Sequence, residues 1–184
     1  MFRTLDFSNC PALDHLDMSS CLIGGNRILS QSVRCLRITR CDFHEEIRTR
    51  ISAPCLISLQ LDGISGLAPL LDRMHLLVAA QVKLNYTCQD TCRHNVYGDC
   101  DICCGHFNNH DGSNSCVLLE GLSDATNLEL TSDFEVFIFR KDCKFCPTFS
   151  KLKTLLLNEW CVAADFGALI FFLQNSPVQA HSPA

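Results

Sequence analysis

The chain has 184 residues, is 47% apolar and 19% charged, and carries a net charge of −5 at pH 7. This length allows one domain with a sizeable core, and the composition is not that of a disordered chain. Nucleic acids and anionic membrane surfaces are poor candidate partners, because both bind clusters of Lys and Arg that this sequence lacks. We find no apolar run of transmembrane length and no signal peptide, and we therefore expect a cytoplasmic or nuclear protein.

The first forty residues repeat one spacing of apolar residues and cysteine. In FRTLDFSNC (2–10), LDHLDMSSC (13–21) and VRCLRITRC (33–41), a cysteine follows an alternating apolar run by three positions. Cysteine is a small, mostly apolar side chain with a weak donor, which suits a tight corner inside a stacked fold. We predict that Cys10, Cys21 and Cys41 form an internal ladder of packed thiols.

A longer-range pattern accompanies these cysteines. The order apolar, two residues, apolar, one residue, apolar starts at six places, which are Leu13, Val33, Leu56, Ala79, Ala125 and Leu152. The intervals are 20, 23, 23, 46 and 27 residues, and the long interval is twice 23. Periods of about 20 to 29 residues with this core are typical of leucine-rich repeats. The sequence therefore predicts an α/β leucine-rich-repeat solenoid over residues 1–86 and 118–177, followed by a disordered tail at 178–184.

The predicted solenoid follows from burial. One short strand cannot bury its own apolar side, so successive turns stack and their strands form a parallel sheet. We expect a curved sheet on the concave side, with short helices and loops on the convex side. Helical turns are expected within residues 41–52 and 66–74, and a terminal helix is expected at 164–174. Phe166, Leu169, Ile170 and Leu173 form one apolar face of this last helix.

The long interval contains a cysteine-rich insert, residues 87–117. It is rich in Asn, Asp and Gly and has few apolar residues, so we interpret it as a mobile loop. One alternative is a zinc-binding module, because the spacing of Cys88, Cys92, Cys100 and Cys103 resembles that of zinc ligands, and a disulfide within the insert is another. Metal analysis of the purified protein separates the zinc-binding module from the mobile loop. We predict no cofactor.

Catalytic motifs are not found. The sequence contains no G-x-S-x-G, no Gly-rich phosphate loop and no H-E-x-x-H. We therefore expect a protein that is not an enzyme, with its cysteines reduced and used mainly for packing.

Three segments carry a family resemblance. ISAPCLISLQLDG (51–63), LLEGLSDATNLEL (118–130) and CPTFSKLKTLLLNEWCV (146–162) resemble the leucine-rich region of plant F-box/LRR-repeat proteins of the FBD-associated class. The resemblance covers nearly the whole chain, from about Leu5 to Pro177, and its most specific part is 146–161. It implies a solenoid that selects the protein substrate of an SCF-type ubiquitin ligase.

The same resemblance defines the expected partners. In this family an F-box docks on the Skp1 subunit of a cullin-based ligase, and no F-box-like LPxxLL segment precedes Phe2 here. We therefore expect a protein substrate or partner, with Skp1 bound only if an F-box is supplied elsewhere. A non-functional truncated fragment is a further alternative.

The candidate partner-binding residues are those that point out from the predicted strands on the concave face. Their mixed charge suggests a protein partner with patches of both signs. They are Asp6, His15, Asp17, Arg37, Ser58, Gln60, Lys83, Asn127, Glu129 and Leu156.

Overall fold

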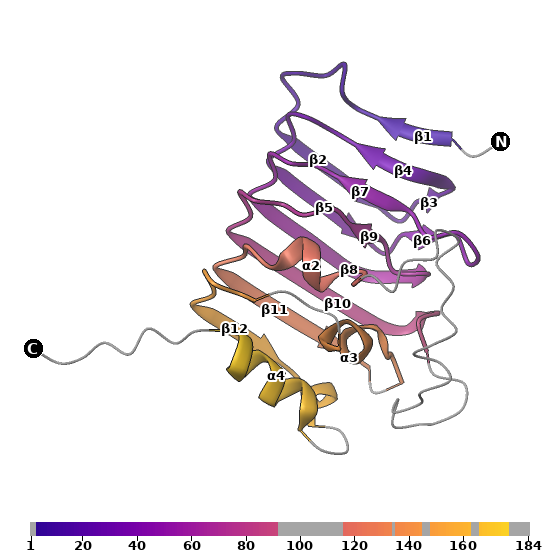
Figure 1. The fold of residues 1–184 in the computed structure, drawn as a ribbon. Helices are drawn as coiled ribbons and strands as arrows, with labels where there is room; N and C mark the ends of the chain where they lie inside the picture. Colours follow the sequence, from indigo (N-terminus) through magenta and orange to yellow (C-terminus); the bar gives the residue numbers. More distant parts are fainter. Residues whose placement is uncertain (1–2, 92–115, 134, 145–147, 163–165, 177–184) are drawn as a thin grey trace, which may run out of the picture.

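The computed structural model describes residues 3–91, 116–133, 135–144, 148–162 and 166–176. In these residues the chain winds into a solenoid of about five turns, built mostly from parallel strands with few helices (Figure 1). The predicted solenoid with a parallel sheet is therefore confirmed. Most of the cysteine-rich insert and the tail at 178–184 lie outside the described residues.

Six parallel strands form the long sheet, which runs the length of the solenoid. Its strand order is β12-β11-β10-β8-β5-β2. The strands are β2 (His15–Ser19), β5 (Cys35–Thr39), β8 (Ser58–Gly66), β10 (Ala79–Cys88), β11 (Asn127–Ser132) and β12 (Thr154–Leu157). Alternation sends one set of side chains inward, and Leu36, Leu59 and Leu128 are 2–3% exposed.

The register corrects one of the predicted repeats. Ala80 pairs with Leu59 and Leu128, and Val82 pairs with Leu61, so the fourth repeat starts at Leu77 and not at Ala79. The stretch LVAAQVKL fits the apolar pattern from either start. Leu77, Ala80 and Val82 have the required spacing, and so do Ala79, Val82 and Leu84. Interstrand hydrogen bonding decides between the two starts.

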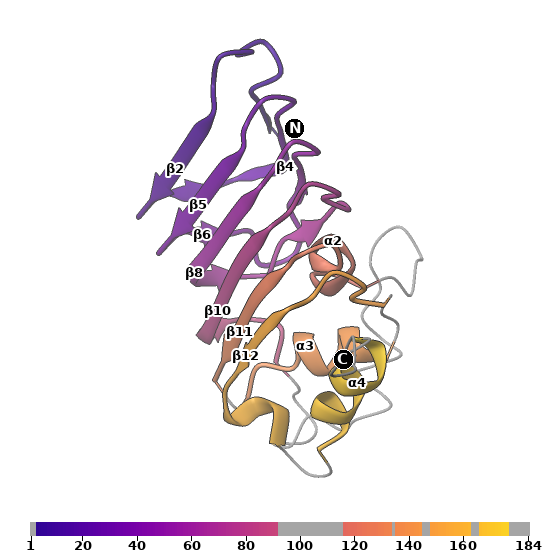
Figure 2. The same cartoon turned by 90° about the vertical axis from the view of Figure 1, so that its left-hand side faces the viewer.

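A second parallel sheet packs against the first across the core. It has the order β1-β4-β7-β9, with β1 (Arg3–Asp6), β4 (Gly25–Leu29), β7 (Arg50–Ser52) and β9 (Leu70–Leu71). A short corner strand, β3 (Leu22–Ile23), pairs with β6 (Asp42–Phe43), which also pairs with β8. Figure 2 shows the strands of each turn stacking above those of the next.

The predicted helical turns at 41–52 and 66–74 are therefore wrong. Those segments hold β6, β7 and β9, which are strands of two or three residues. Phe43 and Ile51 are both buried as expected, but they belong to different strands. Nucleating a helix in so short a return segment is unfavourable, whereas the neighbouring turn offers ready backbone partners.

The chain leaves the long sheet through a repeated left-handed corner. Ser20 and Arg40 both have φ of 51°, and Gly63 has φ of 60° at the equivalent place in the next turn. The residue after the corner turns inward, and Cys41 and Ile64 are both fully buried. This local geometry explains why a small or apolar residue follows each early strand at a fixed distance.

The cysteine ladder is confirmed for two members and wrong for the third. The sulfur atoms of Cys21 and Cys41 are 3.3 Å apart on neighbouring turns. Cys10 is exposed, because β1 pairs with β4 in the second sheet and not with β2. The segment 2–10 therefore leads away from the second sheet, whereas the segments 13–21 and 33–41 lead away from the long sheet.

Helices replace the second sheet in the last turns. They are α2 (Leu119–Leu122), α3 (Ile138–Cys143), the 3-10 helix η1 (Glu159–Val162) and α4 (Gly167–Asn175). Gly121 lets α2 approach β9, because a Cβ on Gly121 would lie 2.4 Å from Cβ of Leu71. Aromatic rings fill this part of the core, with Phe139 and Trp160 centroids 5.1 Å apart.

The predicted terminal helix is confirmed, but the face that it buries differs from the expected one. Ile170 and Leu173 of the predicted apolar face are 47% and 64% exposed, whereas Phe172 is 1% exposed. The Phe149 ring packs on Phe172 at a centroid distance of 5.3 Å. The helix is apolar on all sides, so periodicity alone could not choose its buried face. Among the helices of the described residues, none is long and apolar enough to cross a membrane.

Gly66 gives a direct test of the corner packing. It has φ of 77°, and a Cβ placed there would lie 2.2 Å from the carbonyl oxygen of Phe43. We expect Gly66→Ala to lower the free energy of unfolding by at least about 2 kcal/mol, measured by urea denaturation. Gly24→Ala is the matched control, because no atom lies within 4 Å of its Cβ position. Equal stability of the two variants would contradict the described corner.

Candidate interaction surface

The outer face of the long sheet presents three parallel rows of side chains. The strands are in register, so equivalent residues lie side by side across the sheet. The first row is His15, Cys35, Ser58, Ala79, Asn127 and Thr154. The second row is Asp17, Arg37, Gln60, Gln81, Glu129 and Leu156. The third row is Ser19, Thr39, Asp62, Lys83 and Thr131.

Nine of the ten predicted binding residues belong to these rows, and one does not. Asp6 lies in β1 of the second sheet, away from this face, so its predicted placement is wrong. Lys83 lies in the third row, whereas Gln81 occupies the place predicted for it in the second row. A repeat that starts at Ala79 does not give Gln81 as an outward residue between core positions. Starting at Leu77 gives an interval of 21 residues from Leu56 and places Gln81 correctly.

The second row forms contacts across the N-terminal strands. Arg37 donates from Nε to Oε1 of Gln60 at 2.9 Å. Its Nη1 lies 3.5 Å from Oδ2 of Asp17, so one guanidinium bridges three strands. Arg37 and Asp17 are 59% and 57% exposed, and such an exposed pair contributes only about 0–1 kcal/mol. Little is therefore lost when these groups exchange partners.

A similar contact joins the middle strands. Nε2 of Gln81 donates to Glu129 at 2.7 Å, and Nζ of Lys83 lies 3.3 Å from the same carboxylate. The face thus carries both acidic and basic groups, without a large field of one sign. Leu156 adds an apolar end to the second row and is 50% exposed.

Two shallow hollows join along the first row. The first is lined by His15, Leu16, Asp17, Cys35, Leu36, Arg37, Ser58 and Gln60. The second is lined by Ser58, Leu59, Gln60, Ala79, Ala80, Gln81, Asn127, Leu128, Glu129, Thr154 and Leu156. They share Ser58 and Gln60, and both are lined by residues of the first and second rows.

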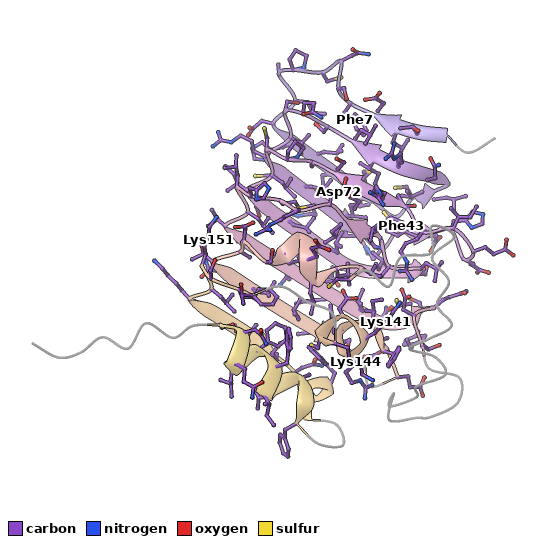
Figure 3. All side chains as sticks on the ribbon, viewed as in Figure 1. Phe7, Phe43, Asp72, Lys141, Lys144 and Lys151 are labelled. Atoms are coloured by element: carbon purple, nitrogen blue, oxygen red, sulfur yellow. The ribbon has the colours of Figure 1, made fainter. Side chains whose placement is uncertain are left out.

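A second polar cluster lies at the edge where the strands begin. The buried carboxylate of Asp124 is 3.1 Å from Nε of Arg73, 3.2 Å from Nδ1 of His75 and 2.8 Å from Nζ of Lys151. These groups come from three successive turns, and Figure 3 shows Lys151 at this edge. Burial raises the pKa of Asp124, but the hydrogen bonds and charges of Lys151 and Arg73 outweigh burial, so that pKa lies below its ordinary value. The cluster holds adjacent loops together.

Two buried carboxylates anchor the ends of the cysteine-rich insert. Asp90 forms a two-point contact with Arg48, at 2.6 and 3.1 Å, and accepts the backbone N–H of Ala68 at 2.8 Å. Asp142 accepts the backbone N–H groups of residues 117, 118 and 119 at 2.6–3.0 Å. Burial raises the pKa of Asp142, and the three N–H donors oppose that rise. The chain is thus fixed just before residue 92 and just after residue 115.

One zinc candidate lies within the described residues. Cys88 ends β10, is 1% exposed and packs in the core. Burial raises the pKa of its thiol to about 12. Cys92, Cys100 and Cys103 lie outside the described residues. Within the part of the chain that the structure describes, no three His, Cys, Asp or Glu side chains are grouped to hold a metal ion.

Comparisons with protein-family models, with curated proteins and with solved structures gave no match to this chain. Its function is therefore inferred from its residues and their geometry.

The Asp124 cluster predicts acid sensitivity. Because the folded-state pKa is lowered, ionised Asp124 stabilises the protein at neutral pH, and this contribution is lost as the pH falls through that lowered value. We expect Asp124→Asn to lower the free energy of unfolding by roughly 1–3 kcal/mol at pH 7. The difference from the wild type should shrink between about pH 5 and pH 2, as urea unfolding at each pH would measure. A constant difference would rule out this role of the carboxylate.

The Arg48–Asp90 pair gives a second prediction. The two side chains are 11% and 1% exposed, so removing the cation leaves an uncompensated buried charge. We expect Arg48→Met to cost about 3–5 kcal/mol of unfolding free energy. Adding Asp90→Asn should restore part of this loss, and a double-mutant cycle in urea would show the coupling. Additive effects would mean that the two groups act independently.

Proposed function

We propose that this chain is a protein-interaction module that binds its partner on the outer face of the long sheet. The observation that carries this proposal is the shared register of six strands from the first row to the third, which aligns mostly polar, exposed or partly exposed side chains across the face. A broad face of this kind provides a large contact area but does not surround a ligand. It suits a macromolecular partner better than a small molecule, which is usually bound in a deep, mostly apolar pocket.

The charge pattern supports a protein partner. Arg37 and Lys83 lie on the same face as Asp17, Asp62 and Glu129, so neither sign predominates. A polyanion such as nucleic acid needs clustered positive charge, whereas protein interfaces match patches of both signs. Because the Arg37–Asp17 pair is exposed and weak, a partner's charged groups can replace it at small cost.

We further propose that the solenoid is of the leucine-rich-repeat type and selects a protein substrate for an SCF-type ubiquitin ligase. Support comes from the resemblance of 51–63, 118–130 and 146–162 to F-box/LRR proteins and from the repeated inward leucines of the long sheet. Contact with Skp1 then depends on an F-box supplied elsewhere. The interaction role does not depend on the ligase role, because the outer face can bind a partner whether or not an F-box is supplied.

Reversal of charge at Arg37 tests the interaction surface. Arg37→Glu places a second carboxylate beside Asp17 and removes the donor to Gln60. Partners would first be captured from a cell extract on the wild-type chain, and the most enriched one would then be purified. We expect Arg37→Glu to weaken its binding at least about tenfold by isothermal titration calorimetry, with an unchanged circular dichroism spectrum.

The matched control is Arg27→Glu. Arg27 is an exposed residue of β4 in the second sheet, so this variant makes the same change of charge on the other side of the core. Equal binding by the two variants would show that the partner does not use the outer face. Tight binding of purified Skp1 to this chain alone would show instead that docking needs no separate F-box.

A further inference from the structure

Cys21 and Cys41 occupy equivalent corners of the first two turns. Their sulfur atoms are 3.3 Å apart. The flanking residues are paired in register, with Ser19 opposite Thr39 on one side of the corner. Leu22 lies opposite Asp42 on the other side. The two cysteines are therefore held next to each other by backbone hydrogen bonds on both sides.

This placement meets the requirements of a disulfide bond. Neighbouring parallel strands lie about 4.8 Å apart, which falls within the usual range of about 4.4–6.8 Å between the Cα atoms of a disulfide. Bond formation requires the sulfur atoms to move from 3.3 Å to about 2.05 Å. A change of this size is available from side-chain rotation and small backbone adjustments.

We propose that Cys21 and Cys41 form a reversible disulfide that cross-links the first two turns of the solenoid. The oxidant is a low-molecular-weight disulfide such as glutathione disulfide. One protein thiolate attacks a sulfur of the oxidant and releases one glutathione thiolate, leaving a mixed disulfide. The second protein thiolate then displaces the second glutathione. The two cysteines together lose two protons and two electrons, and one glutathione disulfide becomes two glutathione molecules.

Exposure sets the order of these steps. Cys41 is fully buried, whereas Cys21 is partly exposed, so Cys21 reacts with the oxidant first and Cys41 resolves the mixed disulfide. Contact with Cys41 and burial both raise the pKa of Cys21. A thiolate is the reactive form, so exchange with the oxidant is slow at neutral pH.

The cross-link acts at one edge of the long sheet. Among the strands of the described residues, β2 is the last of this sheet and pairs within it only with β5. Closing the segment between Cys21 and Cys41 restricts the unfolded chain and ties this end strand to the second turn. The oxidised protein is therefore expected to resist unfolding of its first turn.

Peptide mapping tests the proposal on the full chain. The protein would be held in glutathione redox buffer, its free thiols alkylated under denaturing conditions, and the product digested with trypsin without reduction. We expect residues 4–27, which contain Cys10 and Cys21, to be joined to residues 41–48, which contain Cys41. The thermal midpoint should rise by about 5 °C or more on oxidation and return after dithiothreitol.

Two single variants identify the cysteine used. Cys10→Ser should retain both the joined peptide and the thermal shift, because Cys10 lies in the same peptide but not at the corner. Cys21→Ser should lose both. The proposal is overturned if oxidised wild-type protein yields Cys21 and Cys41 as separately alkylated residues, or if the joined peptide disappears in Cys10→Ser.

Discussion

Backbone hydrogen bonding between successive turns is the constraint on which this structure depends. The register that runs from His15 through Asn127 to Thr154 sets the inner and outer faces at the same time. A shift by one residue would turn the inward leucines toward solvent and bury the charged rows. The apolar core and the proposed interaction surface are thus two results of one alignment. A change in the register of the strands would alter both of them.

The sequence predicts the long sheet well because its signal is local and repeated. Leu36, Leu59 and Leu128 alternate with polar residues, and each lies inward as expected. The start of the fourth repeat is ambiguous in the sequence because both Leu77 and Ala79 fit the pattern, and only the pairing of β10 with β8 and β11 separates them. This two-residue ambiguity accounts for placing Lys83 in the second row and for missing Gln81.

The return segments were harder to predict because their structure depends on contacts distant in sequence. Phe43 and Ile51 are spaced as on a helix, yet each packs in a separate short strand. Asp6 fits the strand pattern, but β1 joins the second sheet, which no local spacing reveals. In α4, apolar residues on all sides left the buried face undetermined, and the Phe149–Phe172 contact decides it.

The buried carboxylates bear on how this solenoid accommodates the doubled interval between β10 and β11. Asp90 and Asp142 fix the chain on either side of residues 92–115, while the buried residues that follow, such as Leu118 and Leu122, belong to the core. The entropy of closing a loop grows only slowly with length, by about 0.6 kcal/mol for each doubling. Residues 91 and 116 therefore mark a natural grafting point, where segments of very different length or composition can be exchanged without rebuilding the turns around them.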